Sequence, residues 1–204
     1  MLGSSLPLKD YLARLSDELN RLDRTAIERW SDLIYEAWDS GQCVFVIGNG
    51  GAATTASHFA EDFGKSLLHV DELQDESRKR LKVLSLTDNA GRITALGNDL
   101  SFDEIFVQQL MNLGGAGDVL IALSGSGNSR NILRAVEWAN RHGLRTFGMT
   151  GYDGGHLKRI QQDGIHIDVA DMGMTQSIHL CLFHWVLDDL YARIHCEGRY
   201  SPAD

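Results

Sequence analysis

The first 40 residues carry an apolar stripe with a helical period. Leu12, Leu15, Leu19 and Leu22 recur at steps of three and four residues, and the stripe is continued by Ile27, Trp30, Leu33, Ile34 and Trp38. This pattern predicts an N-terminal arm of amphipathic helices over residues 1–40. Such an arm covers either its own sheet or another subunit, and the pattern favours neither.

After residue 40 the apolar residues gather in short runs without clean alternation, which is typical of strands covered on both faces. The runs are 43–48, 81–86, 118–123, 144–150 and 164–170. Helical patterns alternate with them, at 53–67, 102–113, 129–142, about 155–162 and 175–195. This alternation predicts an α/β fold with a doubly wound parallel sheet. We expect one domain over 1–204, in which 41–204 form the α/β core and C-terminal helix and the polar stretch 69–80 is an exposed connection.

Composition narrows the range of partners. The net charge of -9 argues against a nucleic-acid surface, because phosphate backbones need clustered Lys and Arg, and weakly against an anionic membrane. The chain lacks an apolar run of roughly 20 residues, and its N-terminus lacks the features of a signal peptide, so a cytoplasmic location is expected. Cys43 and Cys181 lie in apolar segments and are expected to be reduced core residues.

Two glycine-rich loops follow predicted strands. The first is Gly48-Asn49-Gly50-Gly51, and the second is the run SGSGNS at 124–129. Glycines let a backbone approach a ligand closely, and the helix that follows offers free N–H groups. The absence of Lys and Arg from both loops disfavours a P-loop, and GNGGAA does not fit the dinucleotide fingerprint. SGSGNS alone is equally well an ordinary helix cap, but the two loops together favour a sugar phosphate or a similar small anion.

Acids and histidines follow on two predicted helices. His58 and Asp62 are four residues apart and share a helix face, and Glu61 is adjacent. The last helix carries Gln176, His179 and His184. These groups are suited to holding a divalent metal such as zinc, or to proton transfer without one. The alternatives are a surface pair for His58 and Asp62, and satisfied interior histidines for His179 and His184.

Taken jointly, these motifs resemble the SIS (sugar isomerase) family, and within it the phosphoheptose isomerases. The motifs that carry the resemblance are GNGG at 48–51, HFAED at 58–62, GND at 97–99, GDVLIALSGSGNS at 117–129, TGYDGG at 150–155 and the pair Gln176 and His184. The resemblance covers nearly the whole chain. It implies a five-stranded flavodoxin-like sheet and a homotetramer with active sites at subunit boundaries.

The resemblance also implies roles for individual residues. Asp62 or Glu61 and His184 would be the catalytic proton-transfer groups. Zinc, held in some members of the family, would be bound by His58, Asp62, Gln176 and His184. The sugar phosphate would be bound by Asn49, Gly50, Gly51, Asp99, Ser124, Ser126, Ser129 and Gln176.

Three positions depart from the family pattern. Ala52 stands where the family has serine, which removes one hydroxyl that Thr54 or Thr55 would have to replace. Asp62 stands where the family has glutamate, so its carboxylate is set back by about 1.5 Å. Gly173 occupies the place of an aspartate that often precedes the glutamine of the last helix.

The sequence therefore predicts an aldose–ketose isomerase that converts sedoheptulose 7-phosphate, or a similar sugar phosphate, through an enediol. The alternative is a non-catalytic sugar-phosphate-binding or regulatory member of the family, of the kind associated with replication initiation. The departures at Ala52 and Asp62 fit the alternative, whereas retention of His58, Gln176 and His184 favours the enzyme.

Overall fold

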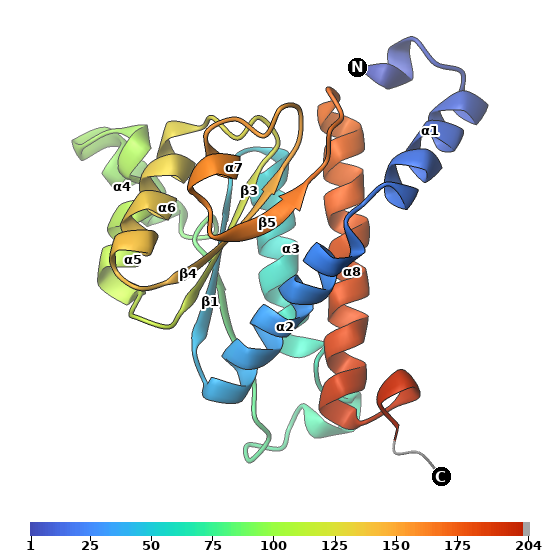
Figure 1. Cartoon of the computed structure of the whole chain (residues 1–204). Coiled ribbons are helices and arrows are strands. Elements are labelled where there is room, and N and C mark those ends of the chain that lie inside the picture. Colours follow the sequence, from blue (N-terminus) through green and yellow to red (C-terminus); the bar gives the residue numbers. More distant parts are fainter. Residues whose placement is uncertain (202–204) are drawn as a thin grey trace.

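A computed structural model describes residues 1–201 (Figure 1). Within these residues five parallel strands form one sheet in the order β2-β1-β3-β4-β5. The strands are β1 (Cys43–Gly48), β2 (Lys82–Ser85), β3 (Val119–Ser124), β4 (Arg145–Thr150) and β5 (Asp163–His166). Val44 of β1 pairs with Val83 of β2 on one side and with Val119 of the central strand β3 on the other. The order confirms the predicted flavodoxin-like doubly wound sheet, whose ligand crevice lies where the chain reverses direction, between β1 and β3.

The fifth strand is shorter than its apolar run predicts. β5 ends at His166, whereas the run continues to residue 170. Ile167 and Val169 are nevertheless buried, since the chain continues through the core after leaving the ladder. The apolar pattern here reports burial and not strand pairing.

Helices cover both faces of the sheet. One face, on the right of Figure 1, carries α2 (Arg24–Ser40), α3 (Gly51–Lys65) and α8 (Met172–His195). The other carries α5 (Val107–Leu113), α6 (Arg130–Arg141) and α7 (Leu157–Ile160), with α4 (Ala90–Asp99) beyond them. The sequence pattern did not predict α4, because every residue of this helix is exposed or half-buried and no apolar stripe marks it. The residues at 69–80 form an exposed connection, as expected, with one turn of 3-10 helix at Val70–Glu72.

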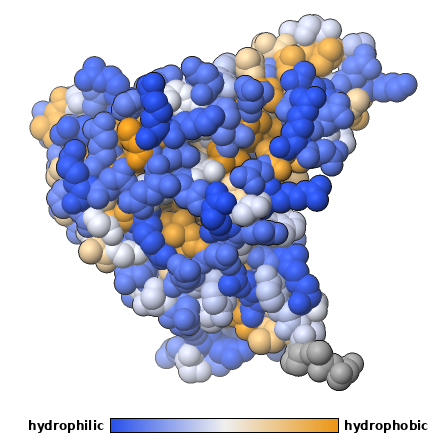
Figure 2. Space-filling model, in the orientation of Figure 1, coloured by the Kyte–Doolittle hydropathy of each residue, from blue (hydrophilic) through white to orange (hydrophobic). Residues whose placement is uncertain are grey.

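The N-terminal arm divides into two helices with different roles. α1 (Leu8–Asn20) and α2 are separate helices. α2 has its own N-terminal cap, Asp23, whose side chain accepts hydrogen bonds from the backbone N–H groups of Thr25 and Ala26. α2 covers the chain's own sheet. α1 projects away from the sheet (Figure 1), and apolar surface gathers over this part of the molecule (Figure 2). Leu8 and Leu12 are 73% and 53% exposed, whereas Leu15 and Leu19 are half-buried against the core, so this chain covers only part of the apolar stripe of α1.

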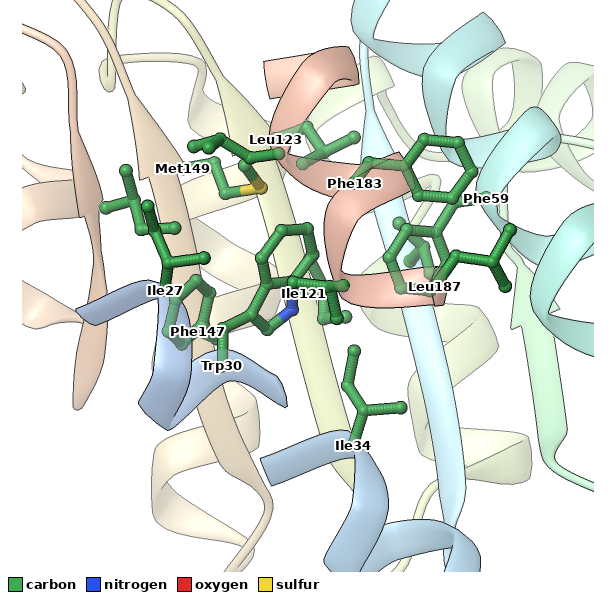
Figure 3. Packing of buried hydrophobic residues seen from close by; sticks show 14 of the residues in the cluster. Ile27, Trp30, Ile34, Phe59, Ile121, Leu123, Phe147, Met149, Phe183 and Leu187 are labelled. Atoms are coloured by element: carbon green, nitrogen blue, oxygen red, sulfur yellow. The ribbon is translucent and has the colours of Figure 1, made fainter. Parts of the chain in front are cut away.

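An aromatic stack joins α2, the sheet and α3 (Figure 3). The fully buried ring of Trp30 lies 5.6 Å from Phe147 and 6.0 Å from Phe59. Phe59 in turn stacks on Phe63 at 4.1 Å. The face of α3 that carries these phenylalanines is fixed against the core, so the residues one position before each of them, His58 and Asp62, lie toward the edge of that buried face.

Two expectations about the rest of the chain have different outcomes. Cys43 is half-buried at the start of β1, and burial raises the pKa of its thiol to about 11. The prediction for Cys181 is wrong, since this residue is exposed on the outer side of α8.

Within residues 1–201, none of the helices combines the length and the apolar character that crossing a membrane requires.

Candidate active site

The two glycine-rich loops meet at the crevice between β1 and β3. Gly48, the last residue of β1, pairs with Leu123 of β3, so both strands end at the same level. Asn49 and Asn131 then exchange two side-chain amide hydrogen bonds, each of 2.9 Å. Asn131 is buried in the first turn of α6 and joins the first loop to the second. Sequence reasoning missed it, and its only signal was its position two residues after SGSGNS.

The serine loop is tightly turned and is supported by its neighbour. The backbone N–H of Gly127 donates to the Ser124 hydroxyl at 3.2 Å. Gly127 has a positive φ of 64°, and a Cβ at this position would lie 2.0 Å from the carbonyl oxygen of Gly154. Only glycine fits this contact between the loops at 124–129 and 151–155.

A pocket of about 280 Å³ opens between the two loops and the start of α8. Its lining consists of Asn49, Gly51, Ala52, Leu123, Ser124, Gly125, Ser126, Ser129, Met172 and Gln176. The pocket lies at the N-termini of α3, α6 and α8, where backbone N–H groups and helix dipoles favour an anion. The arrangement is therefore suited to a phosphate group, although no lysine or arginine belongs to either loop.

A second polar cluster lies two turns further along α3. The Oδ2 atom of Asp62 is 3.1 Å from Nε2 of His58 and 3.9 Å from Nε2 of His184. The two imidazole rings are 5.3 Å apart between centroids. His58 and His184 are 44% and 47% exposed, whereas Asp62 is 18% exposed, so the carboxylate lies beneath two accessible rings. The shorter side chain of Asp62 therefore reaches both histidines.

The two neighbouring acids of α3 have opposite environments. Burial raises the pKa of Asp62, a hydrogen bond with Glu61 raises it further, and the nearby His58 and His184 oppose the shift. Glu61 is exposed and bonded to Lys65, which lowers the pKa of Glu61. The structure therefore places Asp62, and not Glu61, against the histidines.

The cluster fits a divalent metal. His58, Asp62 and His184 each offer one ligand atom, and these atoms lie within 4.8 Å of one another. Two imidazoles and a carboxylate are a donor set that zinc accepts. Gln176 lies eight residues before His184 on the same helix, and its amide packs against Gly51 at the start of α3. It lines the anion pocket.

Other residues singled out in the sequence lie elsewhere. Asp99 is exposed at the end of α4 and, within residues 1–201, is not part of the pocket lining. Thr54 and Thr55 both donate to the Gly51 carbonyl oxygen, so neither replaces the hydroxyl missing at Ala52. His179 is an interior histidine, and burial lowers its pKa to about 4.

Comparisons with known proteins agree with this architecture. The SIS domain family matches residues 9–151. The probable phosphoheptose isomerase of Thermoplasma volcanium is 31% identical over 91% of this chain and 93% of its own length, and the phosphoheptose isomerase of Geobacter sulfurreducens is 35% identical over 82% of this chain and 85% of its own.

Two solved structures are similar over almost the whole fold. The phosphoheptose isomerase GmhA of Neisseria gonorrhoeae superposes with a TM-score of 0.79 at 27% identity, covering 90% of this chain and 98% of that one. The phosphoheptose isomerase of Francisella tularensis gives 0.80 at 27% identity, covering 90% and 95%. From its motifs, its sheet order and these relatives, the chain belongs to the SIS-domain family, in the group of the phosphoheptose isomerases.

Proposed function

We propose that this protein is a sugar-phosphate isomerase that converts sedoheptulose 7-phosphate into an aldoheptose 7-phosphate through an enediol. The observation that carries the proposal is that Asp62 lies against His58 of α3 and His184 of α8, two turns along α3 from the anion pocket. The relatives named phosphoheptose isomerase support the same reaction. Each half of the site supplies one requirement: a place for the phosphate and a set of proton-transfer groups.

The separation of the two halves favours a long sugar. Gly51 and His58 are seven residues apart on α3, which corresponds to roughly 10 Å along the helix axis. An extended chain advances about 1.2 Å per bond, so the seven bonds from C2 to the phosphorus of a ketoheptose 7-phosphate span roughly 8 Å. The three bonds of a triose phosphate span only about 4 Å. A seven-carbon substrate can therefore hold its phosphate in the pocket while its carbonyl end reaches the histidines.

The reaction moves a proton between C1 and C2 of the sugar. It needs a base at the carbon and an acid at the carbonyl oxygen. Burial raises the pKa of Asp62, which makes its carboxylate a stronger base than an exposed aspartate. In the proposal Asp62 takes a proton from C1 while His184 protonates the oxygen on C2, which gives the enediol. Asp62 then returns the proton to C2 while His184 takes the hydroxyl proton from O1, which gives the aldose. Ser124, Ser126 and Ser129, with the helix N-termini, hold the phosphate end.

Zinc is a further part of the proposal. His58, Asp62, Gln176 and His184 would hold it, and a bound zinc would polarise the substrate carbonyl. Asp62 and His184 thus have two assigned roles, ligand and proton-transfer group. Activity measured after chelator treatment and after return of zinc separates the two: activity unchanged by chelation favours direct proton transfer.

The assembly is proposed to be a homotetramer, as the resemblance implies. Its support is the exposed Leu8 and Leu12 of α1, together with a groove lined mainly by apolar side chains and by Arg24 and Glu28. Asp99, remote from the pocket of its own chain, would contribute to the site of a neighbouring subunit. Light scattering on a sizing column tests the mass of the assembly. A cytoplasmic location is part of the same proposal.

The decisive experiment is direct turnover. Purified protein is incubated with sedoheptulose 7-phosphate, with and without added zinc, and the aldose product is measured. Triose phosphate is the matched control that the spacing excludes. Lack of turnover with C5, C6 and C7 ketose phosphates, in either condition, would refute the proposal. The non-catalytic alternative is not favoured, because a protein that only binds a sugar phosphate has no need to gather His58, Asp62 and His184 at one point.

A further inference from the structure

A second group of histidines and carboxylates lies at the opposite end of α8. His69 and Glu72 belong to the connection between α3 and β2, and His195 is the last residue of α8. Each offers one ligand atom, and the three atoms lie within 4.8 Å of one another. His195 is eleven residues beyond His184, which corresponds to roughly 16 Å along the helix. The group is therefore separate from the candidate active site, at the lower end of α8 in Figure 1.

Hydrogen bonds orient both imidazole rings. Nε2 of His195 lies 3.1 Å from the carbonyl oxygen of Leu67, and because a carbonyl only accepts, this nitrogen carries the proton and Nδ1 keeps its lone pair. Nδ1 of His69 lies 2.5 Å from the hydroxyl of Tyr191, and its Nε2 is 3.3 Å from the same hydroxyl and 3.6 Å from a carboxylate oxygen of Glu197. The shorter contact assigns the hydroxyl to Nδ1 and leaves Nε2 as the nitrogen that can bind a metal. Rings with one nitrogen bound to a protein oxygen and the other available are typical of metal-binding histidines.

Glu72 brings a well-positioned negative charge. Its side chain is 14% exposed, and Oε2 accepts a hydrogen bond of 3.0 Å from the backbone N–H of His69. Its other oxygen pairs with Arg78, which neutralises the carboxylate in place of a metal. A carboxylate has about four acceptor positions, so a metal can share Glu72 with these partners or displace Arg78.

We propose that His69, Glu72 and His195 bind a zinc ion, with Glu197 close enough to His69 to complete the set. Ligands about 2.0–2.1 Å from a tetrahedral zinc are roughly 3.3 Å apart, so the three atoms must approach one another by at most about 1.5 Å. Side-chain rotations supply such a movement for half-buried residues. The bound ion would clamp the 66–80 connection to the end of α8, a structural role that does not depend on the isomerase activity.

The test measures zinc in a protein whose first cluster has been removed. In the His58→Ala, His184→Ala double variant, dialysis against a zinc buffer followed by elemental analysis should give one zinc per chain. Adding His195→Ala should reduce this to less than 0.2 per chain. Adding His156→Ala instead is the matched control, because His156 has one nearby carboxylate, Glu137 at 3.9 Å, and lies outside both clusters. Absence of zinc from the double variant, or equal loss in the His156→Ala control, would overturn the proposal.

A second variant covers the case in which His195→Ala disturbs folding. Arg78→Gln in the double-variant background removes the cation that competes for Glu72. Zinc titration with a competing dye should show binding at least threefold tighter than without the change. General disruption of the connection would weaken binding, so unchanged or weaker zinc affinity in Arg78→Gln contradicts the site.

Discussion

Replacing Asp62 with asparagine keeps the shape of the side chain and removes its charge. The amide cannot take a proton from carbon, and it would lie at the same 3.1 Å and 3.9 Å from His58 and His184. General acid–base catalysis contributes roughly 10²- to 10⁴-fold in rate. For Asp62→Asn we therefore expect kcat/KM to fall by this factor, which corresponds to an activation free energy raised by about 2.7 to 5.4 kcal/mol. KM should change by less than about threefold, since the anion pocket lies roughly 10 Å away along α3.

The free energy of unfolding of Asp62→Asn should stay equal to that of the wild type or rise, although its activity falls. The pKa of Asp62 is raised in the folded protein, so the folded state holds its proton to a higher pH than the unfolded chain. Stability from this group is therefore present below the unfolded pKa and is lost as pH rises through the folded one. At pH 7 the charged carboxylate is a net cost that asparagine removes. Asp62→Asn should be at least as stable in urea as the wild type while it loses activity.

Glu61→Gln is the matched control for this prediction. It makes the same chemical change one residue earlier, on an exposed acid that is bonded to Lys65. Its kcat/KM with sedoheptulose 7-phosphate should stay within about threefold of the wild type. Initial rates of aldose formation and urea unfolding curves are measured for all three proteins. If Asp62→Asn keeps more than a tenth of the activity, or if Glu61→Gln loses as much, the assignment of Asp62 as the working acid fails.

Three further changes probe the pocket and the interior. Ala52→Ser restores a hydroxyl to the pocket lining and should lower KM about tenfold, because one hydrogen bond to a charged group has an effect of this size. Ala53→Ser, which lies outside the lining, is the control and should leave KM unchanged. Asn131→Asp breaks one of the two hydrogen bonds to Asn49 and adds a negative charge close to the loop that is proposed to hold the phosphate. Steady-state kinetics should show KM raised at least tenfold (~1.4 kcal/mol) with kcat nearly constant. The control Asn140→Asp, at the far end of α6, should leave KM unchanged. Because burial lowers the pKa of His179 to about 4, the folded state binds fewer protons than the unfolded chain, so stability should fall by about 3 kcal/mol as pH drops from 6.5 to 4. Urea curves of His179→Gln should lack this part of the decline, and a slope identical to the wild type would contradict it.

The sheet could be predicted because its three inner strands, β1, β3 and β4, are almost wholly buried. Each of the five apolar runs contains a strand or most of one, and the two loops with distinctive residues follow β1 and β3, the pair at the switch point. The pocket follows from this topology, since the carboxyl ends of neighbouring parallel strands share one edge. The position of the pocket was therefore within reach of the sequence.

Features that depend on contacts between distant parts of the chain could not be predicted from the sequence. α4 leaves no buried stripe, and the apolar run at 164–170 does not reveal that its last residues leave the ladder. Asn131 looks like an ordinary polar residue until the fold brings it against Asn49, 82 positions away. His179 and His184 lie on one apolar helix, and only the packing of α8 separates the interior one from the one at the site.

The substitution of the family glutamate by Asp62 shows where motif reasoning needs the structure. From the sequence, a side chain shortened by about 1.5 Å implies a displaced carboxylate, and such a displacement can cost roughly 10²-fold. In the fold, Asp62 lies in direct contact with His58 and close to His184. The close approach of α3 and α8 therefore compensates for the shorter side chain of Asp62. The position of a functional group is a property of two packed helices, and the stack of Phe59 and Phe63 on Phe183 sets that approach. The identity of the acid and the packing beneath it must therefore be interpreted together.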